Sequence, residues 1–191
     1  MKGCRALTNE EIVKIEQTLI GTRNKCLFIL GVTTGLRISE LISLKVKSVF
    51  EHGQVASRVS VTRANVKGKI EGRSIALTER AKLIINDLIK EESLAPDMYL
   101  FTSRKGGNIS RKQAWRILNE SFNLLKLQGK VSTHSMRKSL AKRIWEASGK
   151  DIRKTQFALG HRNVNSTISY IGVNSEEIDT LVLGIDSFKA N

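Results

Sequence analysis

The chain has 191 residues, enough for one domain with its own hydrophobic core. Its 32 Lys and Arg residues outnumber its 18 Asp and Glu residues, which gives a net charge of +14. This excess favours a polyanionic partner, because neutralising phosphates releases condensed counterions, although it also fits a ribosome-associated basic protein. A membrane partner is disfavoured, since the basic residues are spread along the chain and the longest apolar run, 26–32, is too short to cross a bilayer.

The two cysteines lack metal-ligand spacing, and no pattern in the sequence indicates a metal or a cofactor. Cys26 lies in the apolar run and is expected to be a buried thiol, while Cys4 lies near the terminus and is expected to be inert. The sequence has no signal-peptide pattern, so the cytoplasm is the expected location. With a single proline and no Ser- or Gly-rich linker, residues 1–191 are predicted to form one domain.

Three helices are predicted in the first quarter of the chain. Thr8-Asn9-Glu10-Glu11 resembles a capping box and predicts a helix from there to about residue 20. A buried helix is predicted over 23–34 and ends at Gly35, and apolar residues at helical spacing predict another over 38–45.

A β-hairpin is predicted next. Residues 55–62 are rich in β-branched side chains and predict a strand, and residues 73–77 predict its partner. The basic, glycine-containing residues 63–72 between them form the expected long tip.

The remainder is predicted to be helical. Thr78 begins a helix with Leu83, Ile84, Leu88 and Ile89 on one face, and a turn follows at 105–108. Ser110 begins a helix to about residue 127 with a second capping-box pattern, and the last helices are predicted at 134–148, 151–160, 164–171 and 175–183. The fold class is therefore α+β, mainly α-helical with a small antiparallel β-sheet.

Five side chains could together attack a phosphodiester without a metal. Such a reaction needs a nucleophile, fixed cations for the phosphate oxygens and a proton donor for the leaving oxygen. Arginine suits the second task because its planar fork pairs with two phosphate oxygens. The candidates, in chain order, are Arg37, His134, Arg137, His161 and Tyr170.

The first candidate, Arg37, follows Gly35 at a helix junction, where Leu36 and Leu41 are expected to anchor the turn in the core. Glu40 could support Arg37 through a direct contact. Arg37 could instead be a surface arginine near a helix start, with Glu40 exposed.

His134 and Arg137 are separated by one helical turn, so both are expected on one face of a helix that Thr133 could cap. Met136, Leu140 and Ile144 are expected to form the core face of the same helix. Alternatively, His134 is a structural histidine and Arg137 is a solvated helix charge.

The segment Leu159-Gly160-His161 is typical of a helix end, with His161 exposed just beyond it. Tyr170 lies nine positions later on a short predicted helix, and the other tyrosine, Tyr99, is expected to be a packing residue. The alternatives are a helix-end histidine favoured by the helix dipole and a half-buried structural tyrosine.

The hairpin tip holds Lys67-Gly68-Lys69. A lysine on a long turn could reach a DNA groove and protonate a departing 5′ oxygen. Both lysines could equally contact only the DNA backbone or water.

The combined pattern resembles the tyrosine recombinases, the family of phage integrases and bacterial chromosome-dimer-resolving recombinases. The likeness runs from about Leu7 to Val173. It rests on three boxes: Thr34-Gly35-Leu36-Arg37-Ile38-Ser39-Glu40-Leu41, His134-Ser135-Met136-Arg137, and Leu159-Gly160-His161 through Ser169-Tyr170.

This resemblance implies a role for each residue. Arg37 and Arg137 would hold the scissile phosphate, and His134 and His161 would assist by hydrogen bonding and proton handling. Tyr170 would form a 3′-phosphotyrosyl intermediate, with no metal or ATP required. Lys67 is the preferred candidate for the family's hairpin lysine and Lys69 the second.

The resemblance also implies partners. Double-stranded DNA is the expected substrate, bound by a homotetramer whose subunits could be monomers in isolation. A segment after the tyrosine, here 175–188, would pack on a neighbouring subunit or fold back on its own domain. The N-terminal helical domain of most members is absent from this sequence, as in a fragment or in the compact fimbrial phase-variation recombinases.

Two other functions share these features. One is a DNA-binding regulator that uses the same scaffold without turnover, and the other is a type IB topoisomerase. In each case, contacts to the DNA backbone are expected from Arg104, Lys105, Arg111, Lys112 and Arg116.

Overall fold

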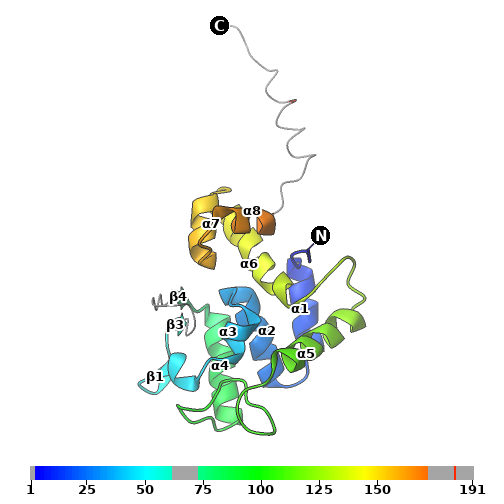
Figure 1. Ribbon diagram of the computed structural model, residues 1–191. Helices are drawn as coiled ribbons and strands as arrows, with labels where there is room; N and C mark the ends of the chain where they lie inside the picture. The colour runs from blue at the N-terminus through cyan, green and yellow to red at the C-terminus, as the bar shows by residue number, and fades with distance from the viewer. Residues whose placement is uncertain (1–2, 62–72, 172–182, 184–191) are drawn as a thin grey trace.

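The computed structural model describes residues 3–61, 73–171 and 183 (Figure 1). Helices dominate this part of the chain, and the strands are short. In order, the elements are α1 (Asn9–Thr18), α2 (Thr22–Thr34), α3 (Ile38–Ile42), the 3-10 turn η1 (Val46–Ser48), β1 (Phe50–Glu51), β2 (Gln54–Val55), β3 (Arg58–Val61), β4 (Arg73–Ala76), α4 (Glu79–Glu91), α5 (Arg111–Leu124), α6 (Thr133–Ala147), α7 (Ile152–Leu159) and α8 (Val164–Ile171).

Helix α2 is the centre of the core. Its residues Cys26 to Val32 are all buried. These residues make the helix apolar around its whole circumference, as is typical of a helix at the centre of a core. Burial raises the pKa of the Cys26 thiol well above its usual value, as expected for a sequestered cysteine. Helices α4 and α6 pack on α2, so this one helix joins the lower part of the molecule to the part formed by α6–α8 (Figure 1).

The approach of α6 to α2 is close at Gly31. A Cβ atom at this position would lie 2.5 Å from the sulfur of Met136. Glycine therefore leaves room for the methionine side chain, which is fully buried. Helices α7 and α8 then pack on α6 and on each other, which places the three segments carrying the predicted histidines and tyrosine in one group.

The predicted hairpin exists, but its first strand is divided. In β3 and β4, Arg58 pairs with Ala76 and Val61 pairs with Arg73. Instead of continuing into β3, residues 54–55 pair with 50–51 in a separate two-stranded sheet. The Ala56 N–H donates a hydrogen bond to the Val49 carbonyl. Ala56 lies between β2 and β3, where the chain passes from one two-stranded sheet to the other.

Three predicted helix starts are confirmed and one is corrected. Thr8 forms the full capping box with Glu11, and Thr78 and Ser110 accept hydrogen bonds from the first turns of α4 and α5. Helix α6 is capped by Ser132 and not by Thr133. The Ser132 backbone is extended, and its Oγ accepts a hydrogen bond from the His134 N–H.

Two predicted helices are shorter than expected. Helix α3 ends at Ile42, and three residues later Lys45 makes a β-bridge with Tyr99. Helix α5 ends at Leu124. In α4 the expected apolar face is confirmed at Leu88 and Ile89 and is wrong at Leu83, which is 65% exposed, while Ala81 and Ile85 are buried.

Some predictions lie outside the described residues. They are the tip of the hairpin with Lys67 and Lys69, the helix at 175–183 and the packing role of 175–188.

Gly35 ends α2 in the left-handed conformation, with φ +60°, and a Cβ there would lie 2.8 Å from Leu140. Gly35→Ala should lower the free energy of unfolding by roughly 1–2 kcal/mol through backbone strain and by about 1 kcal/mol more through this contact. Gly53→Ala is the control, because Gly53 has φ +79° and nothing within 4 Å. Urea unfolding followed by circular dichroism would measure both, and equal losses would contradict a packing role for Gly35.

Candidate active site

Arg37 lies directly before α3, at the junction expected from the sequence. Leu36 and Leu41 are buried and anchor the turn, as predicted. The carboxylate of Glu40 accepts two hydrogen bonds from Arg37, one from its backbone N–H at 2.7 Å and one from its guanidinium at 3.0 Å. The Arg37 side chain remains 40% exposed, so Glu40 orients Arg37 without burying it.

Arg137 is the largest fully buried side chain in the described part of the molecule. It is 1% exposed, so it is not the solvated helix charge considered as an alternative. Its guanidinium donates through Nη1 to the carbonyl of Gly35 and through Nη2 to the carbonyl of Leu159, the latter at 2.6 Å. Arg137 therefore ties the turn before Arg37 to the helix end before His161.

His134 lies one turn before Arg137 but is exposed, whereas Arg137 is buried. The expectation that both side chains share one face is thus only partly correct, since Arg137 turns into the core. His134 is the second residue of α6, where the helix dipole and backbone N–H groups favour an anion.

His161 and Tyr170 are in contact. Gly160 ends α7 in the left-handed conformation, as predicted, and His161 follows it. The rings of His161 and Tyr170 meet edge to face, with centroids 5.0 Å apart and an interplanar angle of 74°. His161 Nδ1 lies 2.9 Å from the hydroxyl of the buried Thr167, which fixes the imidazole against α8.

A lysine not singled out in the sequence also contacts Tyr170. Lys138 Nζ lies 5.5 Å from the centroid of the Tyr170 ring and 3.5 Å from the carbonyl oxygen of Ser169. Tyr170 is half-buried, with His161 from α7 and Lys138 from α6 both against its ring. Tyr99, by contrast, pairs through its backbone with Lys45 in the lower part of the molecule, consistent with a packing residue.

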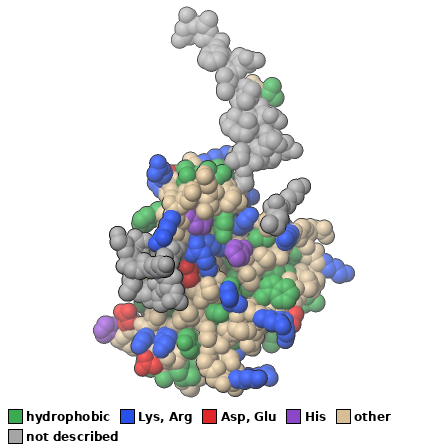
Figure 2. Space-filling view, viewed as in Figure 1, with side chains coloured by type: hydrophobic (Ala, Val, Ile, Leu, Met, Phe, Trp, Pro, Cys, Tyr) green, Lys and Arg blue, Asp and Glu red, His purple; other side chains and the backbone are tan. Residues whose placement is uncertain are grey.

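These contacts join residues from four separate stretches of the sequence. His161 and Tyr170 touch directly, and Arg137 connects the backbones next to Arg37 and His161. Figure 2 shows histidine side chains beside a patch of Lys and Arg side chains near the centre of one face. The combination offers fixed cations, imidazoles and a phenol, which are the groups required for attack on a phosphodiester.

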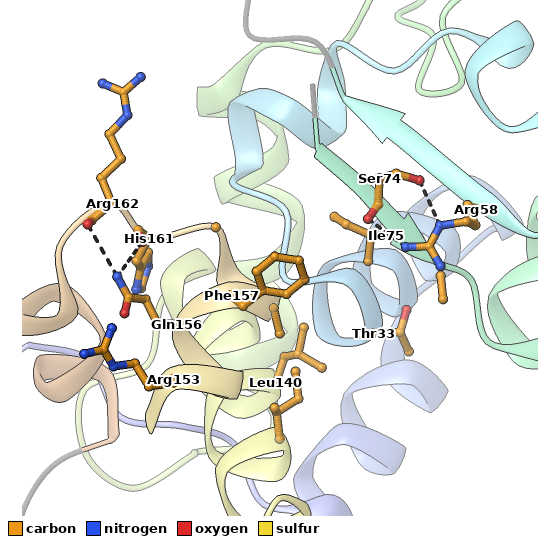
Figure 3. Close-up of a pocket in the computed structure, with 14 residues that line it drawn as sticks. Thr33, Arg58, Ser74, Ile75, Leu140, Arg153, Gln156, Phe157, His161 and Arg162 are labelled. Carbon is orange, nitrogen blue, oxygen red and sulfur yellow. Dashed lines mark hydrogen bonds between the residues drawn. The ribbon is translucent and has the colours of Figure 1, made fainter. Parts of the chain in front are cut away.

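A groove of about 870 Å³ lies beside His161, between the β3–β4 hairpin and helices α6 and α7 (Figure 3). Phe157 projects into it and is 88% exposed. Leu140 and Ile144 line the groove and are only partly buried, so the predicted core face of α6 was correct only at Met136. Among the described residues, both side chains face this groove, which explains why they are only partly buried.

The position of α7 depends on an acidic cap. The side chain of Asp151 accepts hydrogen bonds from the N–H groups of Arg153 and Lys154. The bond from Lys154 is the main reason that the pKa of this carboxyl lies below its usual value. At the other end of α7, the Gln156 amide donates to the carbonyls of His161 and Arg162, which holds the turn after Gly160 (Figure 3).

The residues that support the site could hardly be predicted from local sequence patterns. Lys138 directly follows Arg137, but only the packing of α8 on α6 shows that it reaches Tyr170. Thr167 lies six residues after His161 and could have been suggested only as a small polar residue on the predicted 164–171 helix.

The described residues show neither a metal-binding cluster nor a membrane-spanning helix. Among them, no three His, Cys, Asp or Glu side chains are grouped to hold a metal ion. None of the helices in this part of the chain has the length and apolar character needed to cross a membrane.

A helical domain that brings an arginine turn, a His-x-x-Arg helix and a Gly-His…Tyr segment together has the fold of a tyrosine recombinase catalytic domain. The chain belongs to the phage integrase family, whose sequence profile matches residues 5–177. Probable integrase/recombinase YoeC of Bacillus subtilis is 33% identical over 170 residues, which cover 87% of this chain and 88% of that protein.

Two further proteins extend the comparison. Tyrosine recombinase XerD of Corynebacterium glutamicum is 29% identical over 84% of this chain, and the match covers 52% of XerD. The solved structure of the XerH site-specific recombinase bound to a palindromic difH substrate, a post-cleavage complex, superposes with a TM-score of 0.74 at 24% identity. It covers 93% of this chain and 52% of that one, so the present chain spans about half the length of both recombinases.

Arg137→Lys should destabilise the fold strongly. An ammonium group cannot reproduce the fork that reaches the Gly35 and Leu159 carbonyls, and a buried acceptor would lose its donor. A loss of about 2 kcal/mol or more in the free energy of unfolding is expected. Arg37→Lys is the matched control, because its partly exposed ion pair with Glu40 should contribute less than about 1 kcal/mol. Denaturant unfolding in which both variants lose the same amount would contradict the bracing role of Arg137.

Proposed function

We propose that this chain is the catalytic domain of a site-specific DNA recombinase. Family membership supports this function, as do the names of relatives such as XerD and YoeC. The observation that carries the proposal is the placement of Tyr170 against His161 beside the backbone that Arg137 braces. A regulator without turnover would have no chemical use for this arrangement.

The proposed reaction begins with attack of the Tyr170 phenol oxygen on phosphorus. The bond to the 5′ oxygen breaks, the strand is held as a 3′-phosphotyrosyl ester, and the departing 5′ oxygen takes a proton. A 5′ hydroxyl from another strand then attacks the same phosphorus and releases the tyrosine. Since each step exchanges one phosphoester for another, no ATP is consumed.

Arg37 and Arg137 are assigned to the phosphate, where a guanidinium stabilises the charge that grows on the non-bridging oxygens. Arg137 is 1% exposed and bound to the Gly35 and Leu159 carbonyls, so this assignment requires its guanidinium to become accessible to the phosphate when DNA binds. His134 and His161 are assigned to hydrogen bonding and proton handling, for which the exposure of His134 and the contact of His161 with Tyr170 are suitable. Lys67, or Lys69 in its place, is assigned to protonation of the leaving 5′ oxygen on the basis of the sequence alone.

The substrate in this proposal is double-stranded DNA in the cytoplasm, bound by four copies of the chain. In this proposal, residues 1–191 form one catalytic domain. The positive residues suggested for the DNA backbone support this partner, because all of them are exposed on α5 or on the turn before it: Arg104, Lys105, Arg111, Lys112 and Arg116.

Covalent trapping tests the nucleophile. On a nicked suicide substrate that carries the cognate site, the wild-type chain should form a covalent protein–DNA adduct, and Tyr170→Phe should form none. Tyr99→Phe removes the other tyrosine hydroxyl and should retain the adduct. Denaturing gel electrophoresis of labelled DNA measures both. An adduct that persists in Tyr170→Phe would refute the assignment.

The same assay separates the two competing functions. Relaxation of a supercoiled plasmid without any target site would identify a type IB topoisomerase. Specific DNA binding with no adduct from the full-length wild-type protein would identify a regulator.

Arg37→Ala should affect cleavage far more than binding. The loss of one fixed charge donor at the phosphate is expected to slow single-turnover cleavage by about 10²–10³-fold, while the Kd for DNA should change by less than about tenfold. Arg116→Ala, on the exposed side of α5, should show the reverse pattern. Equal losses of binding and cleavage in Arg37→Ala would mean that this arginine only holds the duplex.

A further inference from the structure

Lys138 connects the helix that carries the buried arginine to the helix that carries the tyrosine. It lies on α6 next to Arg137, and its half-buried side chain reaches α8. Its Nζ makes two contacts there, one with the face of the Tyr170 ring at 5.5 Å and one with the Ser169 carbonyl at 3.5 Å. The same ammonium therefore contacts both the side chain of the tyrosine and the backbone directly before it.

Both contacts attract a cation. The negative face of an aromatic ring favours an ammonium within about 6 Å. The Ser169 carbonyl oxygen is a hydrogen-bond acceptor, and an ammonium group is a donor. Because the two attractions act on adjacent groups, Lys138 restrains the position of the α8 backbone and the rotation of the phenol ring together.

The surroundings of Lys138 restrict it to this position. Arg137, the preceding residue, is fixed by hydrogen bonds to two carbonyls, so this turn of α6 has little freedom. Gly3 lies near the ammonium, since a Cβ built on it would be 3.5 Å from Lys138 Nζ, an ordinary contact distance. Against the tyrosine ring, His161 supplies the other contact, and its bond to Thr167 holds α8 from the α7 side.

We propose that Lys138 is a positioning residue that holds Tyr170 and the end of α8 in the orientation required for attack on the phosphate. The proposal rests on the recombinase function given above. Lys138 acts through Tyr170 and not on the DNA, so its loss should reduce how often the phenol is aligned with phosphorus. The affinity for DNA should be almost unchanged.

Lys142 provides a matched control. It lies one turn further along α6, is exposed, and faces Glu146, 3.8 Å away, instead of the tyrosine. Lys138→Met and Lys142→Met remove the same charge from the same helix. A general electrostatic contribution of α6 to DNA binding would therefore affect the two variants alike.

The first measurement is single-turnover cleavage of the suicide substrate at saturating DNA, together with the Kd for the same DNA. Lys138→Met should cleave about tenfold more slowly, as expected from the loss of the cation–ring and carbonyl contacts, with less than about a twofold change in Kd. Lys138→Arg should restore most of the rate, because a guanidinium can also stack on the ring. Lys142→Met should cleave at the wild-type rate.

The second measurement needs no DNA, so it separates this proposal from the proposed function. In a Tyr99→Phe background, the chain labelled with 3-fluorotyrosine carries one fluorine, at residue 170. Its ¹⁹F resonance should shift and broaden in Lys138→Met and remain in place in Lys142→Met. Thermal unfolding of each variant establishes that it is folded.

An unchanged ¹⁹F resonance in folded Lys138→Met would overturn the proposal, whatever the cleavage assay shows. So would a cleavage defect that appears only as weaker DNA binding or that occurs equally in Lys142→Met. A shifted resonance in a chain that never forms a covalent adduct would instead leave Lys138 as the anchor of Tyr170 and refute the recombinase function.

Discussion

The arrangement of the site depends on one buried guanidinium. A charged side chain taken out of water must be satisfied by hydrogen bonds, and Arg137 meets this need with carbonyl oxygens of Gly35 and Leu159. Neither carbonyl belongs to α6, so the charge is tolerated only when the ends of α2 and α7 are both in place. Through Arg137, helix α6 therefore fixes the backbone of the two turns at Gly35 and at Leu159.

Each of those turns leads directly to a proposed functional side chain. Arg37 is two residues beyond Gly35, and His161 is two residues beyond Leu159. The backbone between the braced carbonyl and the functional residue is short, so little flexibility accumulates along it. Tyr170 is positioned indirectly, through the contacts of its ring with His161 and with Lys138. Arg137 thus fixes the two turns directly by hydrogen bonds, whereas Tyr170 is positioned only through contacts of its ring.

Local signals in the sequence located most of this scaffold. The Thr8 capping box, the buried helix that ends at Gly35 and the α7 end at Gly160 were all predicted, because each follows from the conformational preferences of a few adjacent residues. Contacts between elements were not predictable in this way. The exposure of Leu83, the partial exposure of Leu140 and the burial of Arg137 depend on what packs against each helix. Spacing along one helix does not contain that information.

In the proposed function, the ion pair between Arg37 and Glu40 affects how the chain would bind DNA. A guanidinium paired with a carboxylate adds little to the long-range electrostatic field of a protein, because the two charges largely cancel at a distance. The Glu40 contact already orients Arg37, so binding of the proposed phosphate would cost little further side-chain entropy. In the proposed function, the initial attraction of DNA and the reaction at the phosphate therefore depend on different positively charged residues. Added salt would be expected to slow the first while leaving the second almost untouched.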